Sequence, residues 1–200
     1  MVRVGIINYG VGNLGSLVNA FKRVGSEPII INEPNELTHV DAVVLPGVGS
    51  FDAAMSRLSK FRDELTRVRG SVPILGICLG LQVMFEGSDE GSLSGLSWYP
   101  SRVIRLRGPR VPHIGWDLVK LARPCEIING DGYFYFMHSY AVINPSDDLP
   151  YSGVTHYGDS DILSALCDEK TLTFGVQFHP EKSSRNGLGV LRNFVKLTRK

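Results

Sequence analysis

The first half of the chain alternates short apolar runs with segments in which apolar residues recur at spacings of three and four. The runs have the length and composition of buried strands, at residues 2–8, 29–31, 42–45 and 73–77. The helical spacing predicts helices over 14–24, 51–68 and 79–85, the second capped by Ser50 and closed by Gly70. Alternating strands and helices predict a parallel sheet with helices on both faces.

After Gly87 the pattern changes to short β-like runs separated by Gly, Pro and Asp turns. These runs lie at residues 102–106, 133–136, 163–166 and 171–176, as in hairpins and meanders. An amphipathic helix around 188–195 closes the chain, and there is no repeat or linker. We therefore expect one α/β domain over 1–200, a single three-layer domain with a central mixed, mostly parallel sheet.

The composition excludes several classes of partner. The 200 residues include 21 Lys and Arg against 20 Asp and Glu, a net charge of +1 that gives no field for nucleic acid or an anionic membrane. The longest apolar stretch, 72–81, is interrupted by Pro and Gly and is shorter than the roughly 20 residues of a membrane span. We see no secretory signal and no C-x-x-C among the three cysteines, so we expect a cytoplasmic protein with free thiols.

A glycine-rich turn near the N-terminus offers a first functional hypothesis. Gly10–Gly15 matches G-x-G-x-x-G between a predicted strand and a predicted helix, and Glu33 follows the next strand. A dinucleotide site is one interpretation. The other is a tight turn that lets helix and strand approach closely, which the short chain and the stronger chemistry elsewhere favour.

The segment Gly76–Gly80 is a thiol version of the nucleophile elbow G-x-S-x-G. Cys78 would lie in a strained strand-to-helix turn, where the positive end of the following helix favours a thiolate. The N–H of Leu79 would then be free to bind an oxyanion. For Cys125 and Cys167 we expect buried, inert thiols.

A base and its orienting group follow the last predicted strand in the triplet His179-Pro180-Glu181. Residues i and i+2 of an extended segment point the same way, so Glu181 can set the tautomer of His179. We interpret His39 and His156 as ordinary histidines. A cysteine elbow together with a histidine and a glutamate at a strand end predicts nucleophilic catalysis by Cys78, His179 and Glu181.

The turn Pro46-Gly47-Val48-Gly49 ends another predicted parallel strand. One interpretation is a tight strand-to-helix turn. The other, which we favour, is a second oxyanion donor at Gly47 and Val48, because glycines let a backbone N–H face a substrate.

Two motifs, Gly76–Gln82 and Gly175–Glu181, resemble those of class I (triad-type) glutamine amidotransferases, and the resemblance covers nearly the whole chain. It implies a flavodoxin-like fold, glutamine as substrate, and no cofactor or metal. It also implies two further sets of residues. Glutamine would be held by Gln82, Glu90, Ser139 and Tyr140, and a partner by Asn13, Trp116, Tyr135 and Lys182.

Further segments narrow the resemblance to glutaminase subunits of histidine biosynthesis, at 9–14, 46–51, 112–116, 136–140 and 182–183. Such subunits form a heterodimer with a (β/α)₈ cyclase, to which they pass ammonia. Leu81 and Asp117 depart from the Met and Asn usual in that group. Two alternatives remain at this stage, a stand-alone cysteine amidase of the same fold and a dinucleotide-binding module that uses Gly10–Gly15.

Overall fold

Strands and helices alternate through the first half of the computed structural model, which describes residues 1–10 and 14–198. Its strands are β1 Arg3–Ile7, β2 Glu27–Ile31, β3 Ala42–Leu45, β4 Ile74–Ile77, β5 Phe85–Ser88, β6 Tyr99–Arg105, β7 His113–Leu121, β8 Gly132–His138, β9 Tyr140–Ala141, β10 Tyr151–Tyr157, β11 Ser160–Asp168 and β12 Thr173–Val176. Its α-helices are α1 Leu14–Arg23, α2 Phe51–Leu58, α3 Arg62–Val68, α4 Leu79–Gln82 and α5 Ser184–Leu197, and its 3₁₀ helices are η1 Pro34–His39, η2 Ser59–Phe61 and η3 Pro180–Lys182.

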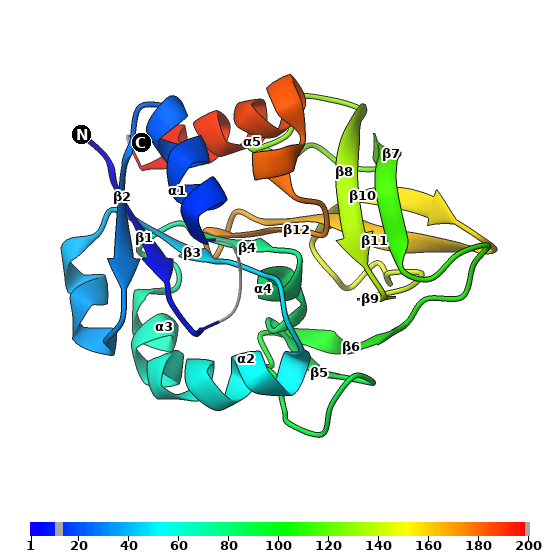
Figure 1. Cartoon of the computed structure of the whole chain (residues 1–200), viewed down its shortest axis with the longest axis horizontal. Coiled ribbons are helices and arrows are strands. Elements are labelled where there is room, and N and C mark those ends of the chain that lie inside the picture. Colours follow the sequence, from blue (N-terminus) through cyan, green and yellow to red (C-terminus); the bar gives the residue numbers. More distant parts are fainter. Residues whose placement is uncertain (11–13, 199–200) are drawn as a thin grey trace.

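A mixed sheet runs through the middle of the molecule, as the sequence predicts. Within the described residues it has nine strands in the order β2-β1-β3-β4-β12-β11-β10-β7-β8. The strands from β2 to β12 pair in parallel, and β11, β10, β7 and β8 continue the sheet antiparallel. Helices α1 and α5 cover one face and α2 and α3 the other (Figure 1). Each face has its own buried apolar cluster, so the three-layer prediction is confirmed.

The structure corrects two predicted helices. The helix expected over 51–68 is divided by the 3₁₀ turn η2, where the Ser59 hydroxyl donates to the Ser56 carbonyl at 3.0 Å, a local bond that competes with helix continuation. Leu58, Phe61 and Leu65 are nevertheless all buried. The helix expected over 79–85 ends at Gln82, because Phe85 begins β5 in the smaller sheet β5-β6-β9.

The expectation of free thiols is wrong for two of the three cysteines. Cys125 and Cys167 form a disulfide, with Cα atoms 5.8 Å apart. Cys125 lies in the loop between β7 and β8, and Cys167 lies near the end of β11. Cys78 is free and buried.

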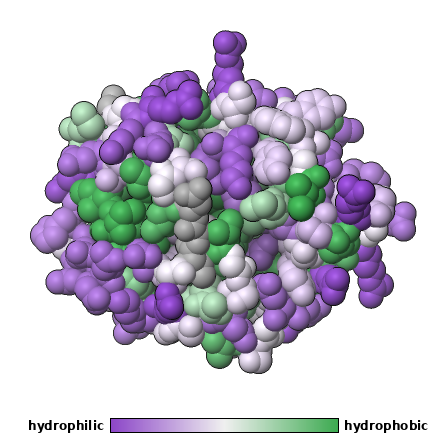
Figure 2. Space-filling view, in the orientation of Figure 1, coloured by the Kyte–Doolittle hydropathy of each residue, from purple (hydrophilic) through white to green (hydrophobic). Residues whose placement is uncertain are grey.

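The surface is mostly hydrophilic on the face that Figure 2 shows. Apolar residues on it gather toward the side where Figure 1 draws β1 and β2. None of the helices in residues 1–10 and 14–198 has the length and apolar character that a bilayer crossing requires.

Candidate active site

Cys78 lies directly after β4, in a backbone conformation that non-glycine residues rarely adopt. Its φ is 52° and its ψ is −105°, and α4 begins at the next residue. A side chain on Gly80 would collide with the Leu45 carbonyl, and one on Gly76 with the Gly80 carbonyl. The two glycines therefore permit the sharp turn that holds the Cys78 side chain at the strand end, as the elbow motif predicts.

His179 lies at the end of the neighbouring strand. The parallel pairing of β12 with β4 places Val176 beside Ile77, so the residues that follow each strand leave the sheet at the same edge. The His179 N–H donates to the Tyr135 carbonyl at 2.8 Å, and the Ser183 hydroxyl donates to the His179 carbonyl at 2.7 Å. These bonds fix the backbone that carries the ring.

The ring of His179 has one nitrogen paired and one unpaired. Nδ1 lies 2.9 Å from Glu181 Oε1, and the Glu181 side chain is only 10% exposed. Nε2 is buried and has no hydrogen-bond partner among the described residues. A carboxylate can only accept, so Nδ1 carries a hydrogen and Nε2 is the nitrogen that exchanges a proton with the site.

The charges around the ring stabilise its protonated form. Burial lowers the pKa of His179, but the neighbouring Cys78 sulfur and the Glu181 carboxylate outweigh burial and raise that pKa to about 10. His179 is therefore an imidazolium beside the Cys78 sulfur, and the Glu181 carboxylate holds it. In this state the sulfur can act as the nucleophile and the imidazolium as the acid.

A cavity of about 270 Å³ opens over Cys78. All the residues predicted to form the oxyanion site or to hold glutamine line it, namely Gly47, Val48, Leu79, Gln82, Glu90, Ser139 and Tyr140. His179 and Glu181 line a smaller hollow, which shares Gly47 and Val48 with this cavity. The structure thus brings the predicted triad, the predicted oxyanion residues and the residues predicted to hold glutamine together around the Cys78 sulfur.

The loop at Gly47 packs directly against the elbow. A side chain on Gly47 would collide with the Leu79 nitrogen and the Ile77 carbonyl. The backbone N–H groups of Val48 and Leu79 make no hydrogen bond within the part of the chain that the structure describes. Two such groups beside a nucleophile are available to an oxyanion.

Glu90 has a structural role that the sequence did not indicate. Its Oε2 accepts the N–H of Phe51 at 2.8 Å, at the start of α2. Ser50, the predicted cap of that helix, makes no capping bond with its side chain. The carboxylate at the helix N-terminus therefore replaces the expected serine, while Glu90 still lines the cavity.

A pair of buried histidines adjoins the cavity on β7 and β8. His113 Nδ1 lies 3.2 Å from His138 Nε2, because β7 and β8 pair these two residues. His138 Nδ1 lies 2.9 Å from the Tyr140 carbonyl, and His113 Nε2 lies 3.1 Å from Asp117 Oδ2. Burial lowers the pKa of His138 to about 3, and lowers that of His113 against the opposing effect of Asp117. His138 is thus neutral at pH 7.

Three of the four predicted partner residues lie together on the surface beside the site. Trp116 is 53% exposed and meets Tyr135 edge-on at 6.2 Å, and the Lys182 ammonium lies 5.9 Å from the Tyr135 ring. Asn13, the fourth, lies outside the described residues. Ile114 and Tyr133 are also exposed on the same hairpin, at 54% and 58%, so large apolar side chains gather on this surface.

The glycine-rich motif near the N-terminus finds little support as a nucleotide site. Residues 11–13 of the motif lie outside the described residues. Glu33, the proposed ribose ligand, forms an ion pair with Lys60 at 3.0 Å. Gly10 has a φ of 75°, as a tight turn requires.

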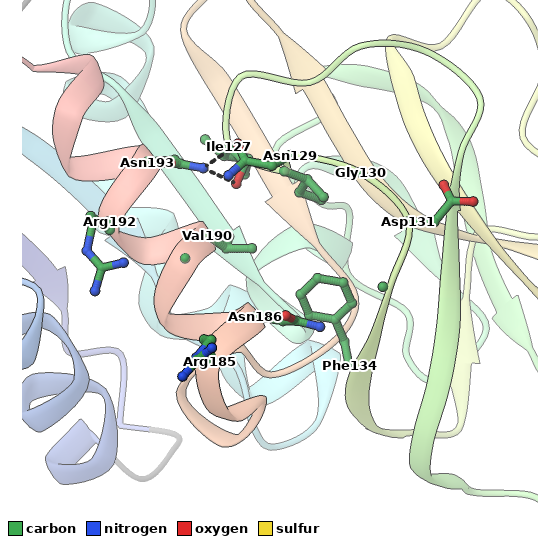
Figure 3. A pocket seen from close by; sticks show the side chains of 13 residues that line it. Ile127, Asn129, Gly130, Asp131, Phe134, Arg185, Asn186, Val190, Arg192 and Asn193 are labelled. Carbon is green, nitrogen blue, oxygen red and sulfur yellow. Dashed lines mark hydrogen bonds between the residues drawn. The ribbon is translucent and has the colours of Figure 1, made fainter.

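A larger hollow of about 390 Å³ lies elsewhere, between α5 and the loop 127–132 (Figure 3). The Asn193 amide spans it, donating to the Ile127 carbonyl at 3.3 Å and to Asn129 Oδ1 at 3.0 Å. Arg185 and Arg192 lie along the helix beside it. The described residues that line this hollow include no cysteine or histidine, so size alone does not identify the reactive site.

Two residues near the sulfur were not expected from the sequence. The Gln177 amide nitrogen lies 3.4 Å from Cys78 Sγ. The Tyr9 hydroxyl is buried without a partner among the described residues, and burial together with the charge of Cys78 raises the pKa of Tyr9. The signal for Gln177 was a polar residue at the end of an apolar run, two residues before His179.

Comparison with known proteins identifies related chains over nearly the full length. The family model described as "Glutamine amidotransferase class-I" matches residues 5–197. Relatives named imidazole glycerol phosphate synthase subunit HisH include those of Methanothermobacter thermautotrophicus, 43% identical over 98% of this chain and 99% of the relative, and Pyrococcus furiosus, 40% identical over 98% and 100%. The Methanopyrus kandleri protein of the same name is 44% identical over 95% of this chain and 96% of its own length.

Solved structures with the same fold are more distant in sequence. A putative GMP synthase component from Thermoplasma acidophilum has a TM-score of 0.79 at 20% identity and covers 100% of this chain and 94% of its own. A structure titled "Crystal structure of glutamine amidotransferase" has a TM-score of 0.74 at 18% identity, with 98% and 99% covered. At such identities the likeness supports the fold alone.

Proposed function

The chain belongs to the class I glutamine amidotransferase family and, within it, to the HisH subunits of imidazole glycerol phosphate synthase, and from this premise we propose how its residues act. It hydrolyses glutamine to glutamate and ammonia, and Cys78, His179 and Glu181 carry the reaction. The observation that supports these roles is the His179 ring, bonded to Glu181 at 2.9 Å through Nδ1 and buried with a free Nε2 beside Cys78.

In the first half-reaction the Cys78 thiolate attacks the side-chain carbonyl carbon of glutamine, forming a carbon–sulfur bond. The carbonyl oxygen becomes an oxyanion, which the N–H groups of Leu79 and of the Gly47–Val48 loop stabilise. His179 Nε2–H then gives its proton to the amide nitrogen as the carbon–nitrogen bond breaks. Ammonia leaves, and the γ-glutamyl group remains on the sulfur as a thioester.

In the second half-reaction the now neutral His179 takes a proton from water, whose oxygen attacks the thioester carbonyl. The same N–H groups stabilise the second oxyanion, and its collapse breaks the carbon–sulfur bond. Glutamate leaves, and the thiolate and imidazolium are restored. Glu181 keeps the imidazole in one tautomer and stabilises each imidazolium.

The glutamine itself lies in the cavity over Cys78 in this proposal. Gln82, Glu90, Ser139 and Tyr140 line that cavity and would hold the amino-acid part of the substrate. Each offers a polar group of the kind that a zwitterionic ligand requires.

The relatives are named as subunits of imidazole glycerol phosphate synthase, and we propose that this chain passes its ammonia to a cyclase partner in a heterodimer. Most free ammonia is protonated at neutral pH and cannot act as a nucleophile, so direct transfer preserves its reactivity. The exposed surface of Trp116, Tyr135 and Lys182 adjoins the site and would form part of the contact. We place the complex in the cytoplasm, where phosphorylated biosynthetic intermediates are held.

The test measures glutamate release from glutamine by the full chain, alone and with the cyclase partner and its substrate analogue. We expect strong stimulation by the partner. Cys78→Ala should abolish glutamate formation and preserve partner binding, because it removes only the sulfur. Full turnover by the Cys78→Ala variant would refute the assigned nucleophile.

A matched pair of surface variants tests the docking surface. Trp116→Ala should weaken the stimulation, whereas Leu93→Ala removes another exposed apolar side chain, 42% exposed, and should leave it unchanged. High glutamate release that the partner does not alter would instead indicate a stand-alone amidase. Heat of binding on titration with NAD or ATP would revive the nucleotide hypothesis.

A further inference from the structure

A buried glutamine faces the nucleophile from the short segment between β12 and His179. The Gln177 residue is 1% exposed, and its backbone N–H donates to the Ser164 carbonyl at 3.1 Å. Its side-chain Nε2 lies 3.4 Å from Cys78 Sγ. Burying an amide is costly unless its polar atoms are paired, so the hydrogen bonds of the Gln177 side chain have to offset its burial.

The orientation of this amide is fixed by the Tyr140 carbonyl. Gln82 Nε2 lies 2.7 Å from that carbonyl oxygen, and only a nitrogen donor is compatible with that distance. The same Nε2 lies 3.2 Å from Gln177 Oε1, so Gln177 must present its oxygen to Gln82. Its nitrogen consequently faces Cys78. Turning either amide over would place two oxygens, or two nitrogens, against one another.

The donor that Gln177 offers differs from the other groups around the sulfur. His179 and Tyr9 both titrate, and the Met137 carbonyl oxygen, 3.9 Å from Sγ, can only accept. An amide N–H does not titrate, so it remains a donor when His179 has given up its proton. A hydrogen bond from a neutral donor to an anionic sulfur stabilises the anion and also fixes its direction.

We propose that Gln177 is a positioning residue for the glutaminase reaction, which holds the Cys78 sulfur by a hydrogen bond whose direction Gln82 and the Tyr140 carbonyl impose. The proposal rests on the function assigned above, with Cys78 as nucleophile. Its effect is felt most when the thioester is breaking down, because the thiolate is then leaving while His179 is changing its charge. Gln177 touches no substrate atom in this account and acts through the sulfur alone.

The test compares two variants that keep the volume of Gln177 and remove its donor. Gln177→Met has neither donor nor acceptor, and Gln177→Glu keeps an oxygen for Gln82 but presents an oxygen to the sulfur. The first readout is the rate at which iodoacetamide alkylates Cys78 in the full chain, followed by mass. The second is kcat and KM for glutamine in the complex with the cyclase partner.

We expect Gln177→Met to slow both alkylation and kcat about tenfold, with KM within about twofold. Gln177→Glu should slow them at least as much, because a carboxylate repels the thiolate. The matched control is Ser26→Ala, which removes a buried hydroxyl that donates to the Phe21 carbonyl at 2.9 Å. Ser26 precedes β2, at the opposite end of the parallel strands from Cys78, so this variant should alkylate as the unmodified chain does.

The proposal would be overturned if folded Gln177→Met were alkylated at the same rate as the unmodified chain. It would also be overturned by a rise in KM with kcat unchanged, because Gln177 would then be a binding residue. If Gln177→Met does not fold, Gln177→Glu decides by the same readings. Alkylation requires neither glutamine nor the partner. A complex that releases no glutamate would therefore refute the proposed function, while the alkylation rates still decide the role of Gln177.

Discussion

His138 makes the stability of this fold depend on pH in a way that can be calculated. Its ring lies between His113 Nδ1 at 3.2 Å and the Tyr140 carbonyl at 2.9 Å, and burial and the nearby charges of His113 and His179 lower its pKa to about 3 against a normal value of 6.5. Between pH 6.5 and pH 3 the unfolded chain therefore binds a proton at His138 that the folded chain does not bind. The stability that the neutral ring contributes is present above pH 6.5 and is lost as the pH falls toward 3.

The magnitude follows from the two pKa values. Near pH 5 the unfolded state carries almost one more proton at this site, so the free energy of unfolding falls by roughly 1.4 kcal/mol for each pH unit. Integrated from pH 6.5 to pH 4, the loss that His138 alone causes is about 3 kcal/mol. A substitution also changes the free energy of unfolding by an amount that is the same at every pH. That amount cancels when the values at two pH values are subtracted.

The assay is urea unfolding of the full chain at pH values from 7 to 4, with His138→Asn beside the unmodified chain. The Asn amide nitrogen can take the place of Nδ1 toward the Tyr140 carbonyl but does not titrate. We expect the acid loss of stability to be about 3 kcal/mol smaller in this variant. His156→Gln is the control, since that side chain is 73% exposed and the variant likewise removes one imidazole.

Parallel stability curves for His138→Asn and the unmodified chain would refute the reasoning. They would mean that His138 accepts a proton in the folded state as easily as in the unfolded one. In that case a second charged imidazole would lie beside His179, and His138 would become a candidate acid for the reaction. The measurement therefore decides between two roles for the ring as well as testing its effect on stability.

Three further predictions concern Tyr9 and the disulfide. Tyr9→Phe should raise the free energy of unfolding by about 1 kcal/mol, because it removes a buried hydroxyl that has no partner among the described residues, and a lower urea midpoint would contradict this. Thiol titration of the unfolded chain without reductant should find Cys78 alone, and all three cysteines after reduction, since Cys125 and Cys167 form a disulfide. Reduction should also lower the melting temperature, because that bond closes a segment of 42 residues and is expected to contribute about 4 kcal/mol.

The catalytic residues could be predicted because their positions depend on local chemistry and one general rule. The turn at Cys78 needs small neighbours whatever surrounds it, so its glycines are visible in the sequence. The rule is that parallel strands expose their carboxyl ends at one edge of a sheet, which brings His179 to Cys78 once β4 and β12 are neighbours.

The residues that support the site could not be predicted, because they depend on register and on contacts between distant segments. The contact of His113 with His138 requires the β7–β8 pairing, and the half-exposed β7 has no clear alternation of polar and apolar residues. The disulfide joins a loop to the end of β11 and follows from their approach in three dimensions. Gln177 could be identified as a buried polar residue, but its partner could not.

The Tyr140 carbonyl links the amides beside the sulfur to the buried pair of histidines. This oxygen accepts from Gln82 Nε2 at 2.7 Å and from His138 Nδ1 at 2.9 Å, so it fixes the amides on one side and the tautomer of His138 on the other. With Nδ1 as donor, the neutral His138 can only accept at Nε2, the nitrogen that lies 3.2 Å from His113 Nδ1. A proton on that nitrogen would add a second positive ring next to the charge of His179. Burial therefore keeps His138 neutral although the Tyr140 carbonyl favours its protonated form, and the positive charge stays on the ring that Glu181 holds.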